Sequence, residues 1–385
     1  MLNFEFYNPT KIVFGADTIA KLSQLVPDNA RVLILYGGAS AEKTGTLAEV
    51  RAALGARMVW EFGGIEPNPS YETMMRAVQQ VRHEKIDFLL AVGGGSVIDG
   101  TKFVAAAAGY DGEPWDIMLT YGKNVKTALP FGTVLTLPAT GSEMNSGAVI
   151  TRKASQTKLP FNSRHVFPQF SVLDPTKTYT LPARQVANGV ADAFVHIVEQ
   201  YLTYPVQALA QDRFAEGLLQ TLVEIAPQAL SKPDDYDVRG NLMWVASLAL
   251  NGLIGAGVPQ DWATHMIGHE LTALYDIDHA RTLAIVLPAL LHAQRDAKRA
   301  KLLQYGERVW GIGAGAEDER IDAAIARTRA FFEDLGIPTR LSAYELGAGA
   351  VEAVVAQLGA HGMTALGEHR DIDLAASRAI LNAAL

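Results

Sequence analysis

The stretch "DFLLAVGGGSVIDGTKFVAAAA", residues 87–108, joins an apolar run to three consecutive glycines, a serine and a segment that can form a helix. We expect a buried strand over 87–92 and a helix that begins near Val97. Such a junction presents the free N–H groups of a first helical turn to an anion, and glycines let a phosphate approach the backbone closely. Gly93 to Ser96 could therefore bind a pyrophosphate, although a plain glycine turn fits this loop equally well. The G-x-G-x-x-G fingerprint is absent, because Ile98 stands where the last glycine would be.

Further apolar runs flank this stretch and alternate with helix-like segments. The sequence predicts strands over 31–36 and 131–140 and an amphipathic helix over 71–84. Strands that are apolar on both faces and separated by helices indicate a parallel sheet covered on both sides.

The pattern changes near residue 181. From about Ala183 onward, alanine, leucine and glutamate recur at helical spacing, as in 213–230 and 320–336, and strand-like runs nearly vanish. We therefore expect an α/β domain over 1–180 and an all-helical domain over 181–385. Two domains also fit the length of 385 residues, since single cores rarely grow beyond about 250–300 residues.

Composition excludes several classes of protein. A net charge of −8 and the lack of a long basic cluster argue against nucleic acid as a partner. The absence of cysteine excludes disulfides and thiolate metal sites, so any metal must use His, Asp or Glu. No signal peptide is recognisable at the N-terminus, and we expect a cytoplasmic protein without a membrane span. The most apolar stretch, 242–258, is interrupted by Asn251 and three glycines and fits a buried helix better.

Two more loops follow predicted strands. The loop "TLPATGSE" (136–143), which offers Thr140, Gly141 and Ser142, comes at the end of an apolar strand, and in open α/β sheets ligands bind at the carboxyl ends of strands. Gly37 and Gly38 follow the strand at 31–36, where an NAD site would carry an acidic residue. Because no carboxylate stands there and Ser40 and Lys43 lie close by, the loop favours NADP(H), although Glu42 weakens this argument. Capped or simple turns are the alternative for both loops.

Four of the nine histidines fall within one part of the helical region. Asp192 and His196 are spaced i, i+4, as are His265 and His269, so each pair shares a helix face; His279 follows closely. Any one of these histidines alone is more often a core or surface residue, but two such pairs with a third histidine indicate a metal site. One carboxylate and three imidazoles suit zinc or ferrous iron. The H-E-x-x-H motif of metalloproteases is absent, which disfavours peptide hydrolysis.

Five motifs together resemble the iron-containing, or group III, alcohol dehydrogenases. They are "GGIEPNP" (63–69), "GGGSVID" (93–99), "TLPATGSE" (136–143), "DAFVH" (192–196) and "GVPQDWATHMIGHELTALYDIDHA" (257–280). Within this family the sequence is most similar to the branch of NADPH-dependent aldehyde reductases and butanol dehydrogenases. The resemblance spans essentially the whole chain. It implies the dehydroquinate synthase-like fold, with a Rossmann-like N-terminal domain, an all-helical C-terminal domain and a divalent metal, Zn²⁺ or Fe²⁺, between them.

The resemblance also implies roles for individual residues. The family's metal ligands fall on Asp192, His196, His265 and His279, while His269 falls beside the metal as a candidate proton relay. The residues that would contact NADP(H) are Gly37, Gly38, Ser40, Gly94, Gly95, Ser96, Asp99, Thr136, Thr140, Ser142 and Lys158. A solvated surface lysine is the alternative for Lys158. Asn145, Val149 and Trp262 are candidates for the substrate wall, and each could equally be a core residue.

The expected activity is hydride transfer between NADP(H) and short- to medium-chain alcohols or aldehydes, in a homodimer. Two alternatives remain at this point. Related enzymes of the wider superfamily include glycerol dehydrogenases and dehydroquinate synthases, although the basic cluster that a synthase needs for its phosphorylated substrate is not evident. A metal phosphatase is the alternative from another class, in which the glycine loop would hold a phosphate ester.

Overall fold

The computed structural model describes residues 1–385, which form two compact units. The α/β unit contains residues 7–182 and 232–247, and the helical unit contains residues 1–6, 183–231 and 248–385. The chain therefore crosses between the units four times, after residues 6, 182, 231 and 247. Two segments depart from a simple division at residue 180: the first six residues group with the helices, and 232–247 group with the sheet.

A six-stranded sheet in the order β1-β8-β5-β4-β2-β3 forms the centre of the α/β unit, and every neighbouring pair is parallel. After β2 the chain adds β3 on one side and then β4 on the other, so the order reverses between β2 and β4. The strands are β1 (Lys11–Phe14), β2 (Arg31–Tyr36), β3 (Met58–Phe62), β4 (Phe88–Gly94), β5 (Phe131–Leu137) and β8 (Phe170–Leu173). The predicted parallel sheet is thus present.

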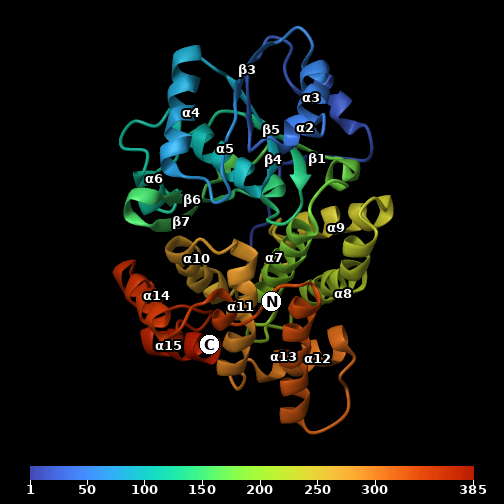
Figure 1. The fold of residues 1–385 in the computed structure, drawn as a ribbon, viewed down its shortest axis with the longest axis vertical. Coiled ribbons are helices and arrows are strands. Elements are labelled where there is room, and N and C mark those ends of the chain that lie inside the picture. Colours follow the sequence, from blue (N-terminus) through green and yellow to red (C-terminus); the bar gives the residue numbers. More distant parts are fainter. The chain divides into compact units, whose positions relative to one another are not determined.

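Helices cover both faces of this sheet because the central strands are apolar on both sides. On one face, Val32, Ile34 and Leu90 form a core with residues of α1 and α3. On the other face α5 packs against β4 and α4 packs against α5, an arrangement that Figure 1 shows. The helices of this unit are α1 (Leu22–Leu25), α2 (Ser40–Lys43), α3 (Thr46–Leu54), α4 (Tyr71–Glu84), α5 (Gly95–Ala107), α6 (Asp116–Leu119) and α9 (Tyr236–Ala249), whose last two residues belong to the helical unit.

A small antiparallel hairpin of β6 (Gly147–Arg152) and β7 (Thr157–Asn162) packs against α5. It follows the loop after β5, and both the hairpin and the central strands β4 and β5 pack against α5.

The helical unit contains no strand. Its helices are α7 (Ala183–Tyr201), α8 (Leu209–Ser231), α10 (Ala263–Tyr275), α11 (His279–Ala293), α12 (Arg299–Trp310), α13 (Glu317–Asp334), α14 (Ala348–Ala360) and α15 (Leu374–Ala383). α7 packs against α8 and α11, and α11 packs against α10, so the three helices that carry the predicted metal ligands are neighbours. No helix of the chain is both long and apolar enough to cross a membrane.

Most predicted elements appear, with shifted ends. The strand at 31–36 and the helix at 71–84 match their predicted bounds, whereas the helix after the glycine loop starts at Gly95, two residues before Val97. The single buried helix predicted over 242–258 is wrong in its second half. α9 ends at Ala249, because Asn251 and Gly252, which has a φ of 90°, begin a turn.

Candidate functional site

Helix α7 supplies the first two predicted ligands. Its residues from Val186 to Tyr201 are all buried, so a carboxylate and an imidazole on this helix lie in the interior. Asp192 and His196 stand one turn apart, and His196 Nε2 lies 3.6 Å from Asp192 Oδ1. A buried aspartate needs a partner of positive charge, since burying an isolated charge is costly.

Helices α10 and α11 supply the other two. His265 is the third residue of α10, and His279 is the first residue of α11. The start of α11 is tied to α7, because Asp278 accepts hydrogen bonds from Arg184 Nε and Asn188 Nδ2, each at 2.9 Å. His279 is therefore held near Asp192 by contacts outside the histidine cluster.

The three predicted histidine ligands each place Nε2 near Asp192 Oδ1, and His265 and His279 form a close group with it that does not include His196. Asp192 Oδ1 lies 3.6 Å, 3.9 Å and 3.7 Å from the Nε2 atoms of His196, His265 and His279. Ligand atoms about 2.0–2.1 Å from a tetrahedral zinc ion are about 3.4 Å apart, so these separations leave room for one such ion. Asp192, His265 and His279 each offer one ligand atom, and these atoms all lie within 4.8 Å of one another.

The donor set fits a divalent cation of borderline softness. His265 Nε2 is buried and has no hydrogen-bond partner, which is unfavourable unless another group binds it. One carboxylate and three imidazoles suit zinc or ferrous iron and leave a divalent ion with net positive charge. Magnesium and calcium would require more oxygen ligands.

Burial and neighbouring carboxylates shift the pKa values of two of these histidines in opposite directions. Burial lowers the pKa of His196 to about 4, so this imidazole is neutral and able to ligate at neutral pH. For His265 burial also opposes the charged form, but the carboxylates of Glu199 and Asp192 outweigh it and raise the pKa to about 9. A metal at this site would therefore replace a proton on His265.

Glu199 is a further member of the site that the sequence reasoning missed. Its Oε2 is hydrogen-bonded to His265 Nδ1, and its side chain is almost fully buried. Asp192, His196 and Glu199 are spaced i, i+4 and i+7 on α7, so helical periodicity alone placed Glu199 on the same face. That spacing was the signal that could have identified it.

His269 and Trp262 border the cluster without joining the four predicted ligands. The buried ring of His269 lies 6.1 Å from that of His265 and 5.1 Å from that of His279. The Trp262 ring lies 5.3 Å from that of His265. Both residues are therefore placed to contact a ligand bound at the cluster.

The predicted phosphate loops all lie at one edge of the sheet. They follow β2, β4 and β5, which are adjacent and parallel, so their carboxyl ends lie side by side. β2 and β4 also flank the point where the strand order reverses, which is where open α/β sheets bind ligands. Thr136 lies at this edge, where the pairing of β4 and β5 shifts by one residue.

Close packing joins the loops after β4 and β5. A Cβ added to Gly95 would lie 2.4 Å from the side chain of Thr140, and one added to Gly94 would lie 2.9 Å from Leu137. Ser142 Oγ donates a 2.6 Å hydrogen bond to Asp99 on α5. Glycines are thus required here to let the two loops approach, and Asp99 acts within the protein as a bridge between them.

Lys158 is not a solvated surface lysine. It is 5% exposed, and its Nζ donates to Asn68 Oδ1 at 2.9 Å. The backbone N–H of Asn68 donates in turn to Ser96 Oγ at 3.3 Å. A buried ammonium group is thereby connected through one residue to the glycine loop.

Two buried ionisable residues beside these loops were missed in the sequence. Lys102 Nζ donates to Asn145 Oδ1 at 2.9 Å and to the carbonyl oxygen of Gly147 at 2.7 Å. Glu143 accepts a hydrogen bond from Ser247 on α9, and burial raises its pKa. Asn145 and Val149, the candidates for the substrate wall, make hydrogen bonds within the α/β unit: Asn145 Oδ1 accepts from Lys102, and the Val149 backbone N–H donates to Asp99.

The loop after β2 presents no free carboxylate. Gly37 and Gly38 lie between β2 and α2, and Ser40 is the first residue of α2. The Glu42 carboxylate, which seemed to weaken the argument for NADP(H), is paired with both terminal nitrogens of Arg51 at 2.9 Å and 3.1 Å. Arg51 also pairs with Glu61, at 2.6 Å and 2.9 Å, so its single positive charge is shared between two carboxylates and compensates the charge of Glu42 only in part.

Comparison with protein families assigns the chain to a class. Residues 9–175 match the model of the iron-containing alcohol dehydrogenases, and residues 186–385 match that of the C-terminal region of the same family. The chain belongs to the iron-containing alcohol dehydrogenase family, as the sequence motifs indicated.

Several members of this family are similar to the chain in sequence and structure. The chain is 63% identical to the NADPH-dependent aldehyde reductase YqhD of Escherichia coli, with full coverage of both chains. It is 43% identical to a probable NADH-dependent butanol dehydrogenase of Bacillus subtilis, with 90% of each chain covered. A crystal structure of E. coli YqhD superposes with a TM-score of 0.99, covering 100% of this chain and 99% of the YqhD chain. The crystal structure of an NADH-dependent butanol dehydrogenase A from Thermotoga maritima, which is 34% identical, superposes with a TM-score of 0.96 and covers 100% of this chain and 99% of the other.

Proposed function

We propose that this protein is an NADP(H)-dependent aldehyde reductase and alcohol dehydrogenase that uses one divalent metal ion, zinc or ferrous iron. The α/β unit would bind the dinucleotide, and the helical unit would bind the metal through Asp192, His196, His265 and His279. The observation that carries the proposal is the convergence of three imidazole Nε2 atoms on Asp192 Oδ1 at 3.6–3.9 Å. The relationship to an NADPH-dependent aldehyde reductase supports the reaction type.

The chemistry divides between the bound groups and the protein. A metal ion at this site would polarise the substrate oxygen as a Lewis acid, and NADPH would supply the hydride. The protein would hold the metal-binding side chains in fixed orientations. Because most of these side chains are buried, few water molecules could compete with the metal for them. His269 would hold the proton that the reduced substrate acquires, with the cofactor ribose as the alternative carrier.

The three loops at the carboxyl edge of the sheet would bind the cofactor in different ways. Gly94, Gly95 and Ser96 would offer backbone N–H groups at the start of α5 to the pyrophosphate, with Asp99, Thr136, Thr140 and Ser142 beside them. Gly37, Gly38 and Ser40 would accept the 2′-phosphate, since neither glycine places a carboxylate there and Arg51 holds the Glu42 carboxylate in an ion pair. Lys158 would add a positive charge near the phosphates through its position beside Asn68.

The substrates we expect are short- to medium-chain aldehydes and alcohols. The test follows the loss of NADPH absorbance when butanal is added to protein whose metal content has been measured. A parallel assay uses NADH in place of NADPH. Reduction of butanal that is faster with NADPH and that disappears on chelation supports the proposal. A metal-replete protein that oxidises neither cofactor, yet releases phosphate from a chromogenic ester, would instead identify the phosphatase alternative.

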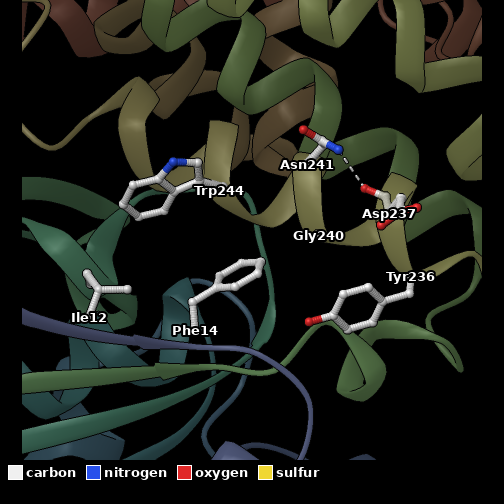
Figure 2. Close-up of a pocket in the computed structure, with 7 residues that line it drawn as sticks. All are labelled: Ile12, Phe14, Tyr236, Asp237, Gly240, Asn241 and Trp244. Atoms are coloured by element: carbon white, nitrogen blue, oxygen red, sulfur yellow. Dashed lines mark hydrogen bonds between the residues drawn. The ribbon is translucent and has the colours of Figure 1, made fainter.

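We also propose that the protein forms a homodimer through a groove on the α/β unit, which Figure 2 shows. β1 is an edge strand of the sheet, and α9 lies across from its residues Ile12 and Phe14. The groove has a volume of about 410 Å³, and its other lining residues are Tyr236, Asp237, Gly240, Asn241 and Trp244. Phe14, Tyr236 and Trp244 are each 37–42% exposed, and exposed aromatic clusters at a sheet edge favour association with another protein surface. In the proposed homodimer the same groove on each copy would meet its counterpart across a twofold axis.

Sedimentation velocity tests this interface. Trp244→Glu should convert a dimer to a monomer, because it removes a large aromatic side chain and adds a second carboxylate to a groove that already contains Asp237. Met58→Glu on β3, the opposite edge strand, is the control, since Met58 is 60% exposed and lies outside the groove. A wild-type monomer, or a Trp244→Glu dimer, would contradict the proposal. A cytoplasmic location stays a prediction.

A further inference from the structure

The side chain of Glu199 makes contacts with two different parts of α10. Its Oε1 accepts hydrogen bonds from the backbone N–H groups of Thr264 at 2.7 Å and His265 at 3.3 Å. Its Oε2 is hydrogen-bonded to His265 Nδ1. One carboxylate therefore caps the first turn of the helix and holds the imidazole that this turn carries.

This contact decides which ring nitrogen of His265 is available. A neutral imidazole carries one proton, and a carboxylate on Nδ1 can only accept, so it keeps the proton on Nδ1. Nε2 then keeps its lone pair, and Nε2 is the nitrogen that faces Asp192 Oδ1 at 3.9 Å. We propose that Glu199 is a positioning residue for the metal site, which fixes both the orientation and the tautomer of His265 so that Nε2 can bind the ion.

A glutamine at position 199 cannot make the same set of contacts. If its amide oxygen faces the two backbone N–H groups, its NH₂ group faces Nδ1, and His265 must then carry its proton on Nε2, which blocks ligation. If the amide is reversed, its NH₂ group opposes two N–H donors at the helix start. Carboxylate partners of metal-binding histidines typically change metal affinity 10- to 100-fold when removed.

The chain contains two matched controls. Glu270 lies on the same helix, and its nearly fully buried carboxylate is bonded to His361 Nδ1 at 2.7 Å, outside the four predicted ligands. Asp261 caps the same helix end without touching an imidazole, since its Oδ1 accepts from the Ala263 N–H at 3.0 Å. Glu270→Gln thus tests loss of a buried Glu–His pair. Asp261→Asn tests loosening of the helix start together with loss of the buried Asp261–Lys298 ion pair at 3.0 Å, neither of which involves the His265 ring.

The experiment measures zinc affinity of metal-free protein by competition with a chromophoric chelator. Glu199→Gln should weaken zinc binding 10- to 100-fold, while Glu270→Gln and Asp261→Asn remain within about threefold of wild type. An unchanged affinity for Glu199→Gln would overturn the inference. An equal loss for Asp261→Asn would also overturn it, because the effect would then come from the helix start alone.

A second measurement does not depend on how the variants fold. In zinc-loaded wild-type protein with ¹⁵N-labelled histidine, the His265 signals should show a proton on Nδ1 and the metal on Nε2; the reverse arrangement would refute the role of Glu199. The inference rests on the proposed metal site and not on redox activity. Wild-type protein that fails to bind zinc or iron at all would reject the site itself, whereas normal binding without NADPH oxidation would reject only the proposed reaction.

Discussion

Gly38 follows β2 at the position where an acidic side chain would be expected in an NAD site. A Cβ at this residue would meet nothing within 4 Å, so a side chain fits without strain. We expect Gly38→Asp to raise the KM for NADPH about tenfold, because a carboxylate there repels a 2′-phosphate and instead favours the ribose hydroxyls of NADH. Gly38→Asn has nearly the same shape without the charge. Steady-state kinetics with both cofactors should show the shift for aspartate only; equal effects of Asp and Asn would point to crowding.

His279 and His269 lie close together but are expected to differ in role. His279 Nε2 is 3.7 Å from Asp192 Oδ1, whereas His269 is not among the residues grouped around that oxygen. His279→Ala should lose the bound metal, and with it turnover. His269→Ala should retain the metal and lose rate or change its pH dependence. Elemental analysis of both purified variants checks this expectation, and a metal-free His269→Ala protein would mean that the ligand set is misassigned.

The residues of the metal cluster were recognisable in the sequence because their type and spacing carry the information. Histidine and aspartate at i, i+4 on an apolar helix have few other reasons to occur together. Glu199 carries the same periodic signal, but it acts on His265, which is 66 residues further along the chain. That pairing depends on how α7 packs against the start of α10, which no local pattern encodes.

Helix α5 carries a buried lysine, Lys102, that holds the segment after the β5 loop through Asn145 and Gly147. Burial lowers the pKa of Lys102 to about 8, against an ordinary value of 10.5. Between these values the folded protein has lost the proton that the unfolded chain still binds, so stability should rise with pH in this range and fall as pH drops toward 8. The gain is at most about 3 kcal/mol, because each pKa unit corresponds to about 1.4 kcal/mol.

Chemical denaturation of wild type and Lys102→Met at pH 8, 9 and 10 measures this contribution. Methionine removes the titrating group and the hydrogen bonds to Asn145 and Gly147, so it shifts stability by an amount that does not depend on pH. The difference between the two proteins should therefore change with pH. Parallel pH profiles would show that Lys102 stays charged throughout the range.

The elements themselves were largely predictable, and their ends were not. Runs such as "RVLILY" have no polar face and must form a strand buried on both sides, which β2 is. The helix after the glycine loop begins at Gly95 because close packing against Thr140 sets its start, and such a long-range contact leaves no trace in the local pattern. α9 ends at Ala249 although the apolar residues continue, since the turn at Gly252 overrides the hydrophobic pattern.

The whole molecule is built from two units, neither of which is one continuous piece of chain. Residues 232–247 join the α/β unit only after 49 residues of the helical unit have intervened, 183–231. Gly240 of this segment packs near Phe14 and Pro175, and Ser247 donates a 2.5 Å hydrogen bond to the fully buried Glu143. The sequence predicted a single boundary near residue 181. It did not predict that 232–247 return to the α/β unit, because the composition of α9 resembles that of the other helices.

A fragment of residues 7–182 alone should therefore be unstable and prone to aggregate, because it leaves the contacts of α9 unmade and Glu143 without Ser247. The same fragment with 232–247 attached through a flexible linker should unfold cooperatively. Thermal melts followed by circular dichroism compare the two. Equal melting temperatures would show that α9 adds little to the unit.

Because the chain crosses between the units four times, the α/β unit is synthesised in two separate parts. When residue 182 has left the ribosome, α9, the last helix of the α/β unit, has not yet been synthesised. At roughly 5–20 residues per second, about 3–13 seconds pass before residue 247 follows. For that interval all six strands have been made, but Phe14 and Glu143 still lack their contacts with Gly240 and Ser247, so the α/β unit cannot complete its packing.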